Sequence, residues 1–133
     1  MRAINRLVFH HSASSLPTTF EEVERWHVEN NGWDSIGYHY VIESSGKVVP
    51  GRDLDEMGAH AKGANGDSIG ICLVGSNDVP EERWTAQQID AANDLIGALR
   101  RVLGGTLTVY GHRDVGTTAT ICPGVDVAEV LNV

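Results

Sequence analysis

The sequence predicts a single α/β domain in which helices flank a central mixed β-sheet. Its 133 residues are enough for one domain with a buried core. Short apolar runs typical of buried strands alternate along the chain with capped segments of helical periodicity. The chain shows no internal repeat, linker or low-complexity tract, so we expect residues 1–133 to form one unit.

The first predicted elements are a strand and a helix. Residues 7–10 form a short apolar run typical of a buried strand. After a loop rich in Ser, Pro and Thr, Thr19 and Glu22 have the spacing of a capping box, in which each side chain bonds a free backbone N–H of the other residue. An apolar face follows, so we expect a helix that reaches Glu29.

The middle of the chain predicts a hairpin, a loop and a further strand. Residues 38–42 and 47–49 are joined by Ser-Ser-Gly and predict a β-hairpin. Residues 52–67 are rich in Gly and Ala and follow neither periodicity, so we expect a long surface loop of the kind that often has a function. The apolar run at 68–74 returns the chain to the sheet.

A second helix is predicted after this strand, because Thr85 and Gln88 repeat the capping signature. Its apolar positions follow helical spacing at Ile89, Ala92, Ile96, Leu99, Val102 and Leu103. Gly104 ends the pattern, residues 106–110 alternate as a strand, and residues 125–131 predict a short closing helix.

Composition excludes several classes of function. Hydrophobic residues make up 41% of the chain and charged residues 21%, which is ordinary for a globular protein. No apolar run reaches the roughly 18 residues of a membrane span, and the apolar patch near the N-terminus is too short for a secretory signal. We therefore expect a soluble protein without membrane insertion. A net charge of −8 argues against a nucleic-acid binder with a basic face.

The two cysteines have different surroundings. Cys72 lies in the apolar run IGICLVG and is typical of a small core residue, so we expect no disulfide between it and Cys122. Cys122 closes the stretch GHRDVGTTATICPG, in which His112 follows a predicted strand. Imidazole nitrogen and thiolate sulfur are ligands that zinc prefers, so this loop predicts part of a zinc site. We expect Arg113 and Asp114 to pair with each other and brace the loop.

A catalytic zinc site typically has three protein ligands and a fourth position for water, so a third ligand is needed. His10 and His11 lie at another strand end, where a ligand is held rigidly. His60 lies on a Gly-rich loop that would hold a ligand poorly, and we interpret His27 and His39 as structural. Successive strand side chains point to opposite faces, so the pattern alone leaves His10 and His11 as alternatives.

Four segments then resemble a known family in the same order: VFHHSAS, WHVENNGWDSIGYHYVI, GAHAKGANGDSIGICLVG and GHRD…TICPG. They resemble the zinc-dependent N-acetylmuramoyl-L-alanine amidases, a family that includes short-tailed phage lysozymes and the animal peptidoglycan recognition proteins. The resemblance covers residues 7–124 and is strongest to the phage branch. It implies an amidase and peptidoglycan recognition protein-like fold, with residues 1–133 as one catalytic domain.

The resemblance also implies roles for individual residues. It assigns zinc to His10, His112 and Cys122. Tyr38 of the GYH segment falls on the position that lies near the metal-bound water in such enzymes. Thr120 takes a second helper position that is often lysine in phage members and often threonine in recognition proteins. We expect Tyr38 and Thr120 to donate hydrogen bonds to the developing oxyanion.

The substrate implied by the resemblance is peptidoglycan, cleaved at the amide between N-acetylmuramic acid and L-alanine of the stem peptide. Zinc can polarise that amide and lower the pKa of bound water from about 15.7 toward 7. The HAKGANGDSIG loop then forms a wall of the substrate groove, with His60, Lys62 and Asn65 as polar contacts and Trp33 as an aromatic contact.

Two other functions are weighed beside hydrolysis. Members of the family without the cysteine ligand bind peptidoglycan and do not cut it, but this chain keeps Cys122. A structural zinc domain needs four ligands, and His11 is the candidate to complete the set.

The resemblance further suggests a phage endolysin that stays in the host cytoplasm until it is released to the cell wall. Some phage relatives also bind host RNA polymerase, which makes that enzyme a candidate partner. We expect a monomer.

Overall fold

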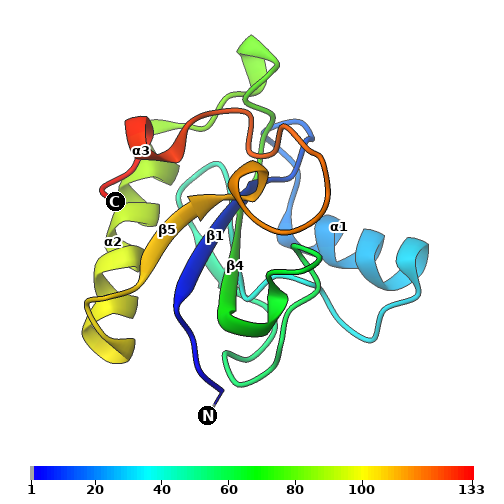
Figure 1. Cartoon of the computed structure of the whole chain (residues 1–133). Helices are drawn as coiled ribbons and strands as arrows, with labels where there is room; N and C mark the ends of the chain where they lie inside the picture. The colour runs from blue at the N-terminus through cyan, green and yellow to red at the C-terminus, as the bar shows by residue number, and fades with distance from the viewer. Residues whose placement is uncertain (1) are drawn as a thin grey trace.

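The computed structural model describes residues 2–133 and contains one five-stranded sheet (Figure 1). The strands are β1 (Arg6–His11), β2 (Tyr40–Ile42), β3 (Val48–Pro50), β4 (Ser68–Leu73) and β5 (Thr108–Gly111). Their order across the sheet is β3-β2-β4-β1-β5. Only β3 runs antiparallel to its neighbour, so the predicted mixed sheet is confirmed.

Strand β1 lies between β4 and β5 in the sheet. It pairs in parallel with β4 on one side and with β5 on the other, with His10 opposite Cys72 and Phe9 opposite Gly111. Parallel strands end at the same edge, so the loops after β1 and β5 leave the sheet side by side. The segment that follows β5 passes over this edge before it reaches α3 (Val127–Val130) (Figure 1).

Helix α2 (Ala86–Leu103) covers one face of the sheet (Figure 1). The predicted capping box at Thr85 and Gln88 is present, and the helix ends at Gly104 as predicted. The buried side chain of Gln88 also donates hydrogen bonds to the carbonyl groups of Ile42 and Val74, which fastens the start of the helix to the sheet. The apolar residues packed between α2 and the sheet include Leu7, Phe9, Ile69, Ile71, Leu73, Ala92, Ile96 and Leu99.

The opposite face is covered by α1 (Phe20–Arg25), which starts at the predicted capping box. The chain continues without a break into η1 (Trp26–Asn30), where the helix widens to a π-helix. The predicted extent to Glu29 is therefore right, although the sequence pattern did not predict the wider last turn. A separate apolar cluster lies under α1 and is formed by Phe20, Val23, Ile36, Val41, Cys72 and Val74.

Several further predictions are confirmed in outline. The hairpin and the closing helix are present, but β2 and α3 are shorter than predicted and β3 is shifted by one residue. The long loop before β4 holds one short 3-10 turn, η2 (Asn65–Asp67). Both cysteines are free and Cys72 is fully buried, as expected for a core residue. Among the helices of residues 2–133, none combines the length and apolar character needed to cross a membrane.

Candidate functional site

The structure places the two adjacent histidines at the end of β1 in different surroundings. Alternation along the strand turns the side chains of His10 and Cys72 to the face of α1, whereas His11 points to the other side. The Nδ1 atom of His11 accepts a hydrogen bond from the backbone N–H of Asn77 at 3.2 Å. His11 is therefore occupied in holding a neighbouring loop, and the alternative in which it completes a four-ligand site is not supported by this geometry.

His10 meets His112 and Cys122 at the edge of the sheet. One ligand atom from each of the three residues lies within 4.8 Å of the others. The distance from Cys122 Sγ to His10 Nδ1 is 3.7 Å. A tetrahedral zinc ion with Zn–N of about 2.0 Å and Zn–S of about 2.3 Å places nitrogen and sulfur roughly 3.5 Å apart. The spacing of His10 and Cys122 is therefore close to that of a zinc site, and His112 lies within 4.8 Å of both.

A second observation supports the same site. Across residues 2–133, buried side-chain nitrogen and oxygen atoms have hydrogen-bond partners except Nε2 of His112. A buried polar atom without a partner is costly, and such atoms commonly face an ion or water. The unpartnered nitrogen belongs to the cluster with His10 and Cys122, so a metal ion would satisfy it.

The electrostatics of the three donors suit a cation. Burial lowers the pKa of His10 well below its usual value, and burial also lowers the pKa of His112, so both rings are neutral and keep a lone pair at neutral pH. Burial raises the pKa of the Cys122 thiol to about 11. Ionisation of this thiol near neutral pH therefore requires a nearby positive charge, which a divalent metal supplies.

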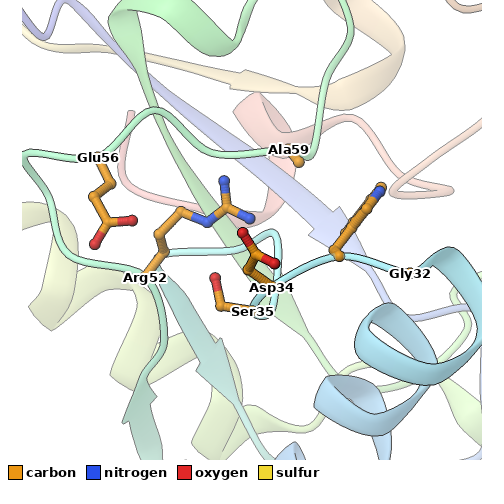
Figure 2. Close-up of a pocket in the computed structure, with 7 residues that line it drawn as sticks. Gly32, Asp34, Ser35, Arg52, Glu56 and Ala59 are labelled. Carbon is orange, nitrogen blue, oxygen red and sulfur yellow. The ribbon is translucent and has the colours of Figure 1, made fainter.

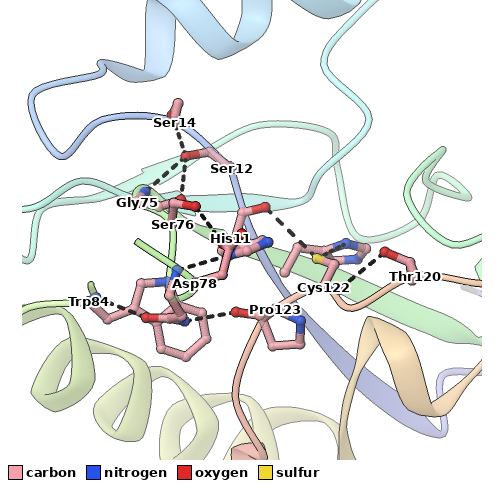
Figure 3. A network of polar contacts seen from close by, with 12 residues as sticks. His11, Ser12, Ser14, Gly75, Ser76, Asp78, Trp84, Thr120, Cys122 and Pro123 are labelled. Atoms are coloured by element: carbon pink, nitrogen blue, oxygen red, sulfur yellow. Dashed lines mark hydrogen bonds and ion pairs between the residues drawn. The ribbon is translucent and has the colours of Figure 1, made fainter. Parts of the chain in front are cut away.

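Hydrogen bonds hold the Cys122 loop in place (Figure 3). The backbone N–H of Cys122 donates to Thr120 Oγ1 at 3.1 Å, and its carbonyl accepts from the N–H of Arg113 at 2.6 Å. The side chain of Asn77, which is buried, donates to the carbonyl of Pro123 at 2.8 Å. The cysteine is thus fixed from both sides, as a ligand in a preformed site needs to be.

The prediction for the HRD segment is wrong in its details. Arg113 and Asp114 form no ion pair with each other, although both residues are described by the structure. Asp114 accepts a hydrogen bond from the backbone N–H of Gly111 at 3.0 Å instead. A carboxylate that bonds the first free N–H of a turn already stabilises it, so the loop is braced without the arginine side chain.

Tyr38 lies beside the metal-ligand cluster. Its ring centroid is 5.0 Å from that of His10 and 5.2 Å from that of His27. Burial, together with the Cys72 and Cys122 thiols, raises the pKa of Tyr38 well above its usual value. The hydroxyl therefore stays protonated at neutral pH. His27 accepts from the N–H of Gly37, in agreement with the structural role predicted for it.

The residues predicted as substrate contacts surround one hollow next to the cluster. It has a volume of about 250 Å³, and its lining includes Trp33, His60, Lys62, Asn65 and His112. The loop before β4 and the loop after β5 meet there, where the backbone N–H of Thr117 donates to the Lys62 carbonyl.

Two of these residues also make hydrogen bonds within the protein. Asn65 Oδ1 accepts hydrogen bonds from the backbone N–H groups of His60 and Ala61, at 3.0 and 2.9 Å. The Nδ1 atom of His60 lies 2.9 Å from Nε2 of His10. Burial lowers the pKa of His60 to about 3, so this ring is neutral. Sequence reasoning missed both roles, because neither contact has a local sequence signal.

A second hollow, with a volume of about 420 Å³, shares part of its lining with the first. Figure 2 shows the residues that line it. Trp33 and Ala59 line both hollows. The guanidinium of Arg52 reaches into the second one, held by the carbonyl groups of Ile36 and Met57. Sequence reasoning did not select Arg52, whose only signal was its position at the start of the Gly-rich loop. The two hollows together form a groove beside the ligand cluster, and the hollow nearer the cluster has the more apolar lining.

Comparison with known proteins identifies the family. Residues 1–125 match the family model described as N-acetylmuramoyl-L-alanine amidase. The chain belongs to this amidase family. Similar relatives include an endolysin of Enterobacteria phage K11, which is 41% identical over 79% of this chain and 69% of the relative. Peptidoglycan-recognition protein SC2 of Drosophila melanogaster is 35% identical over 90% of the chain and 68% of the relative.

Solved amidase structures share the fold. The N-acetylmuramoyl-L-alanine amidase LysC from Clostridium intestinale superposes with a TM-score of 0.83 at 30% identity, covering 97% of this chain and 83% of that protein. The predicted amidase-like α/β fold and the prediction of an N-acetylmuramoyl-L-alanine amidase are thereby confirmed. Its reaction is hydrolysis of the amide between N-acetylmuramic acid and L-alanine of the peptidoglycan stem peptide.

Proposed function

We propose that this amidase is a zinc enzyme in which His10 Nδ1, His112 Nε2 and Cys122 Sγ hold the metal. The observation that carries the proposal is the approach of one donor atom from each of the three side chains to within 4.8 Å. One of these side chains, His112, also has a buried nitrogen without a hydrogen-bond partner. When bound, zinc supplies Lewis acidity toward the amide carbonyl and toward water. Three protein ligands leave a coordination position for that chemistry.

Tyr38 acts in this proposal as a hydrogen-bond donor. Its raised pKa keeps the phenol protonated at neutral pH, so it cannot serve as a general base there. A phenol O–H beside the ligand cluster can donate to the amide oxygen as negative charge develops on it. The hydroxyl thus lowers the barrier without changing its own charge.

Thr120 is the second proposed donor. Its oxygen already accepts the N–H of Cys122, which leaves its own O–H free to turn toward the substrate. A neutral hydroxyl adds less stabilisation to an oxyanion than the lysine found at this position in many phage members. We therefore expect the loss of Thr120 to cost less activity than the loss of such a lysine would.

The groove is proposed to bind the stem peptide and the adjoining sugar. Trp33 offers an apolar wall to both hollows, and Lys62 and Asn65 offer polar groups in the hollow nearer the metal. His60 lines the same hollow as a ring, because both of its nitrogens are engaged by His10 and Ser68. Arg52 places a guanidinium in the farther hollow, where it suits a carboxylate of the peptide. Lys62 and Arg52 thus place one cation in each hollow, and Asp34 and Glu56 line the farther hollow beside Arg52.

The similarity to phage endolysins supports a role in bacterial lysis. We propose that the enzyme stays in the host cytoplasm until it is released to the cell wall, where its substrate lies. Residues 1–133 act in this proposal as one catalytic domain and as a monomer. Binding of host RNA polymerase stays a prediction from the family resemblance.

Digestion of purified cell wall tests the function. Zinc-loaded enzyme should release stem peptides with a new L-alanine amino terminus, identified by mass spectrometry, and EDTA should abolish the release. Cys122→Ser serves as the inactive control. Sacculi that stay intact with the zinc-loaded enzyme would favour a module that binds peptidoglycan without cutting it.

A further inference from the structure

The contact between His60 and His10 gives His60 a role besides lining the groove. The two rings meet edge to face, with centroids 5.0 Å apart and planes at 85°. Nδ1 of His60 lies 2.9 Å from Nε2 of His10, which is good hydrogen-bonding distance. The nitrogen of His10 engaged here is not the one that faces Cys122, because Nδ1 has that position.

The neighbours of His60 determine the direction of this hydrogen bond. Ser68 Oγ lies 2.6 Å from the carbonyl of Ala64, to which it donates its one hydrogen. The same oxygen lies 3.2 Å from Nε2 of His60, so it must accept a hydrogen from that nitrogen. An imidazole ring with its hydrogen on Nε2 has a bare Nδ1, so Nδ1 of His60 accepts from Nε2–H of His10. His10 is left with its lone pair on Nδ1.

The fold reserves space for the His60 ring. A Cβ atom added at Gly70 would lie 2.5 Å from Cγ of His60, and one added at Gly58 would lie 2.6 Å from Cδ2. No side chain fits at either position while the ring stays where it is. Asn65 fixes the backbone on the other side, through the N–H groups of His60 and Ala61. The ring is therefore held although it lies on a long loop.

We propose that His60 is a positioning residue that fixes the tautomer and orientation of His10, so that Nδ1 of His10 is presented to the metal. The inference rests on the proposed zinc site. Partners that bond the second nitrogen of a ligating histidine typically change metal affinity by about 10- to 100-fold when removed. A role limited to substrate contact would leave metal binding unaltered, so binding measured without substrate separates the two roles.

The test measures metal binding by substrate-free protein. Zinc affinity is determined by competition with a chromophoric chelator, and the Co²⁺-substituted protein reports ligand geometry through its thiolate charge-transfer and d–d absorption bands. His60→Ala should lower zinc affinity by about 10- to 100-fold and shift the Co²⁺ bands. His60→Asn should recover most of the affinity, because an amide oxygen can accept from His10 in place of Nδ1.

Lys62→Ala is the matched control, since Lys62 lies on the same loop and lines the same hollow. It should leave zinc affinity and the Co²⁺ spectrum unaltered. If His60→Ala does not fold, Ser68→Ala carries the test, because it removes the acceptor that fixes the His60 tautomer. Its zinc affinity should then fall several-fold, by less than about 10-fold.

The results separate the inference from the function on which it rests. The positioning role would be overturned if His60→Ala kept the wild-type zinc affinity and Co²⁺ spectrum. Where Ser68→Ala has to be used, wild-type zinc affinity in that variant would overturn it. Neither result would contradict the proposed zinc site. A wild-type protein that binds no zinc would instead overturn the proposed zinc site itself.

Discussion

The two faces of the sheet are built differently. The face under α2 is closed by a long helix and is lined throughout by apolar side chains such as Leu7, Phe9 and Ile96. The opposite face has a short α1 and a long loop over it, and histidines and Tyr38 lie beside the apolar residues there. One face therefore supplies stability, while the other has less apolar packing and carries a set of polar groups that can do chemistry.

Loss of a metal ligand on the face under α1, called the open face below, should have the largest effect on zinc binding and activity. Cys122→Ser replaces the soft thiolate that zinc prefers, so zinc affinity should fall by more than the roughly 100-fold typical of an outer partner, and cell-wall hydrolysis should stop. Zinc content is measured by atomic absorption, and folding by circular dichroism. Cys72→Ala should keep its zinc. A Cys122→Ser protein that unfolds would indicate a structural metal site instead.

Tyr38→Phe should come next. Removal of a donor to a developing oxyanion typically costs about 10²- to 10³-fold in kcat. Turnover of a soluble muropeptide measures this loss, while zinc content should stay at the wild-type level. Tyr40→Phe is the control, because Tyr40 packs against the apolar cluster under α2. The turnover of this variant should equal that of the wild type. Equal turnover by Tyr38→Phe and wild type would remove the tyrosine from the proposed mechanism.

A substitution on the face under α2, the closed face, should lower the stability of the fold and leave catalysis unchanged. Ile96 is only 2% exposed, so Ile96→Ala should lower the free energy of unfolding by about 2–5 kcal/mol. Val102 on the same helix is 78% exposed, and Val102→Ala should change it by less than about 0.5 kcal/mol. Urea unfolding measures both. A loss of kcat in folded Ile96→Ala protein would contradict the division between the faces.

Thr120→Ala should have a modest effect on the open face. The variant removes one neutral hydrogen-bond donor, worth about 0.5–1.5 kcal/mol, so kcat should fall by roughly 2- to 10-fold. It also removes the acceptor for the N–H of Cys122, so a small loss of zinc affinity should accompany the change. Thr120→Ser should restore both quantities. A loss of kcat as large as that of Tyr38→Phe would make the hydroxyl an equal partner.

The weakest expected effect is a dependence of stability on pH. Burial lowers the pKa of His39 below its usual 6.5, and its Nδ1 accepts from the N–H of Gly70, so the folded state keeps the ring neutral. Below a pH of about 6.5 the unfolded chain binds a proton at His39 that the folded chain does not bind. The free energy of unfolding should therefore fall as the pH drops from about 7 to 5. The slope from one histidine is at most about 1.4 kcal/mol per pH unit. Urea unfolding of zinc-free protein should show a flatter slope for His39→Gln.

The sequence predicted those parts of the fold that depend on local patterns. Both capping boxes and the apolar spacing of α2 are local patterns, and the structure confirms them. The π-helical turn at residues 26–30 has no such pattern. The expected pairing of Arg113 with Asp114 was wrong because the carboxylate bonds a nearer backbone N–H.

The site was less accessible to sequence reasoning from the residues alone. The spacing of His112 and Cys122 indicated zinc, but His10 and His11 stayed equivalent until the faces of β1 were known. The family resemblance selected His10, and the structure places His10 beside His112 and Cys122. The contacts of His60 with His10 and the place of Arg52 join parts of the chain that only the folded sheet brings together.

The shared wall between the two hollows has a practical consequence. Trp33 borders both of them and packs edge to face on His27, with ring centroids 4.8 Å apart. Indole fluorescence responds to local polarity and to nearby imidazole. A protein in which Trp26 and Trp84 are replaced by phenylalanine would therefore carry one intrinsic optical reporter, whose emission follows the filling of the groove from either end.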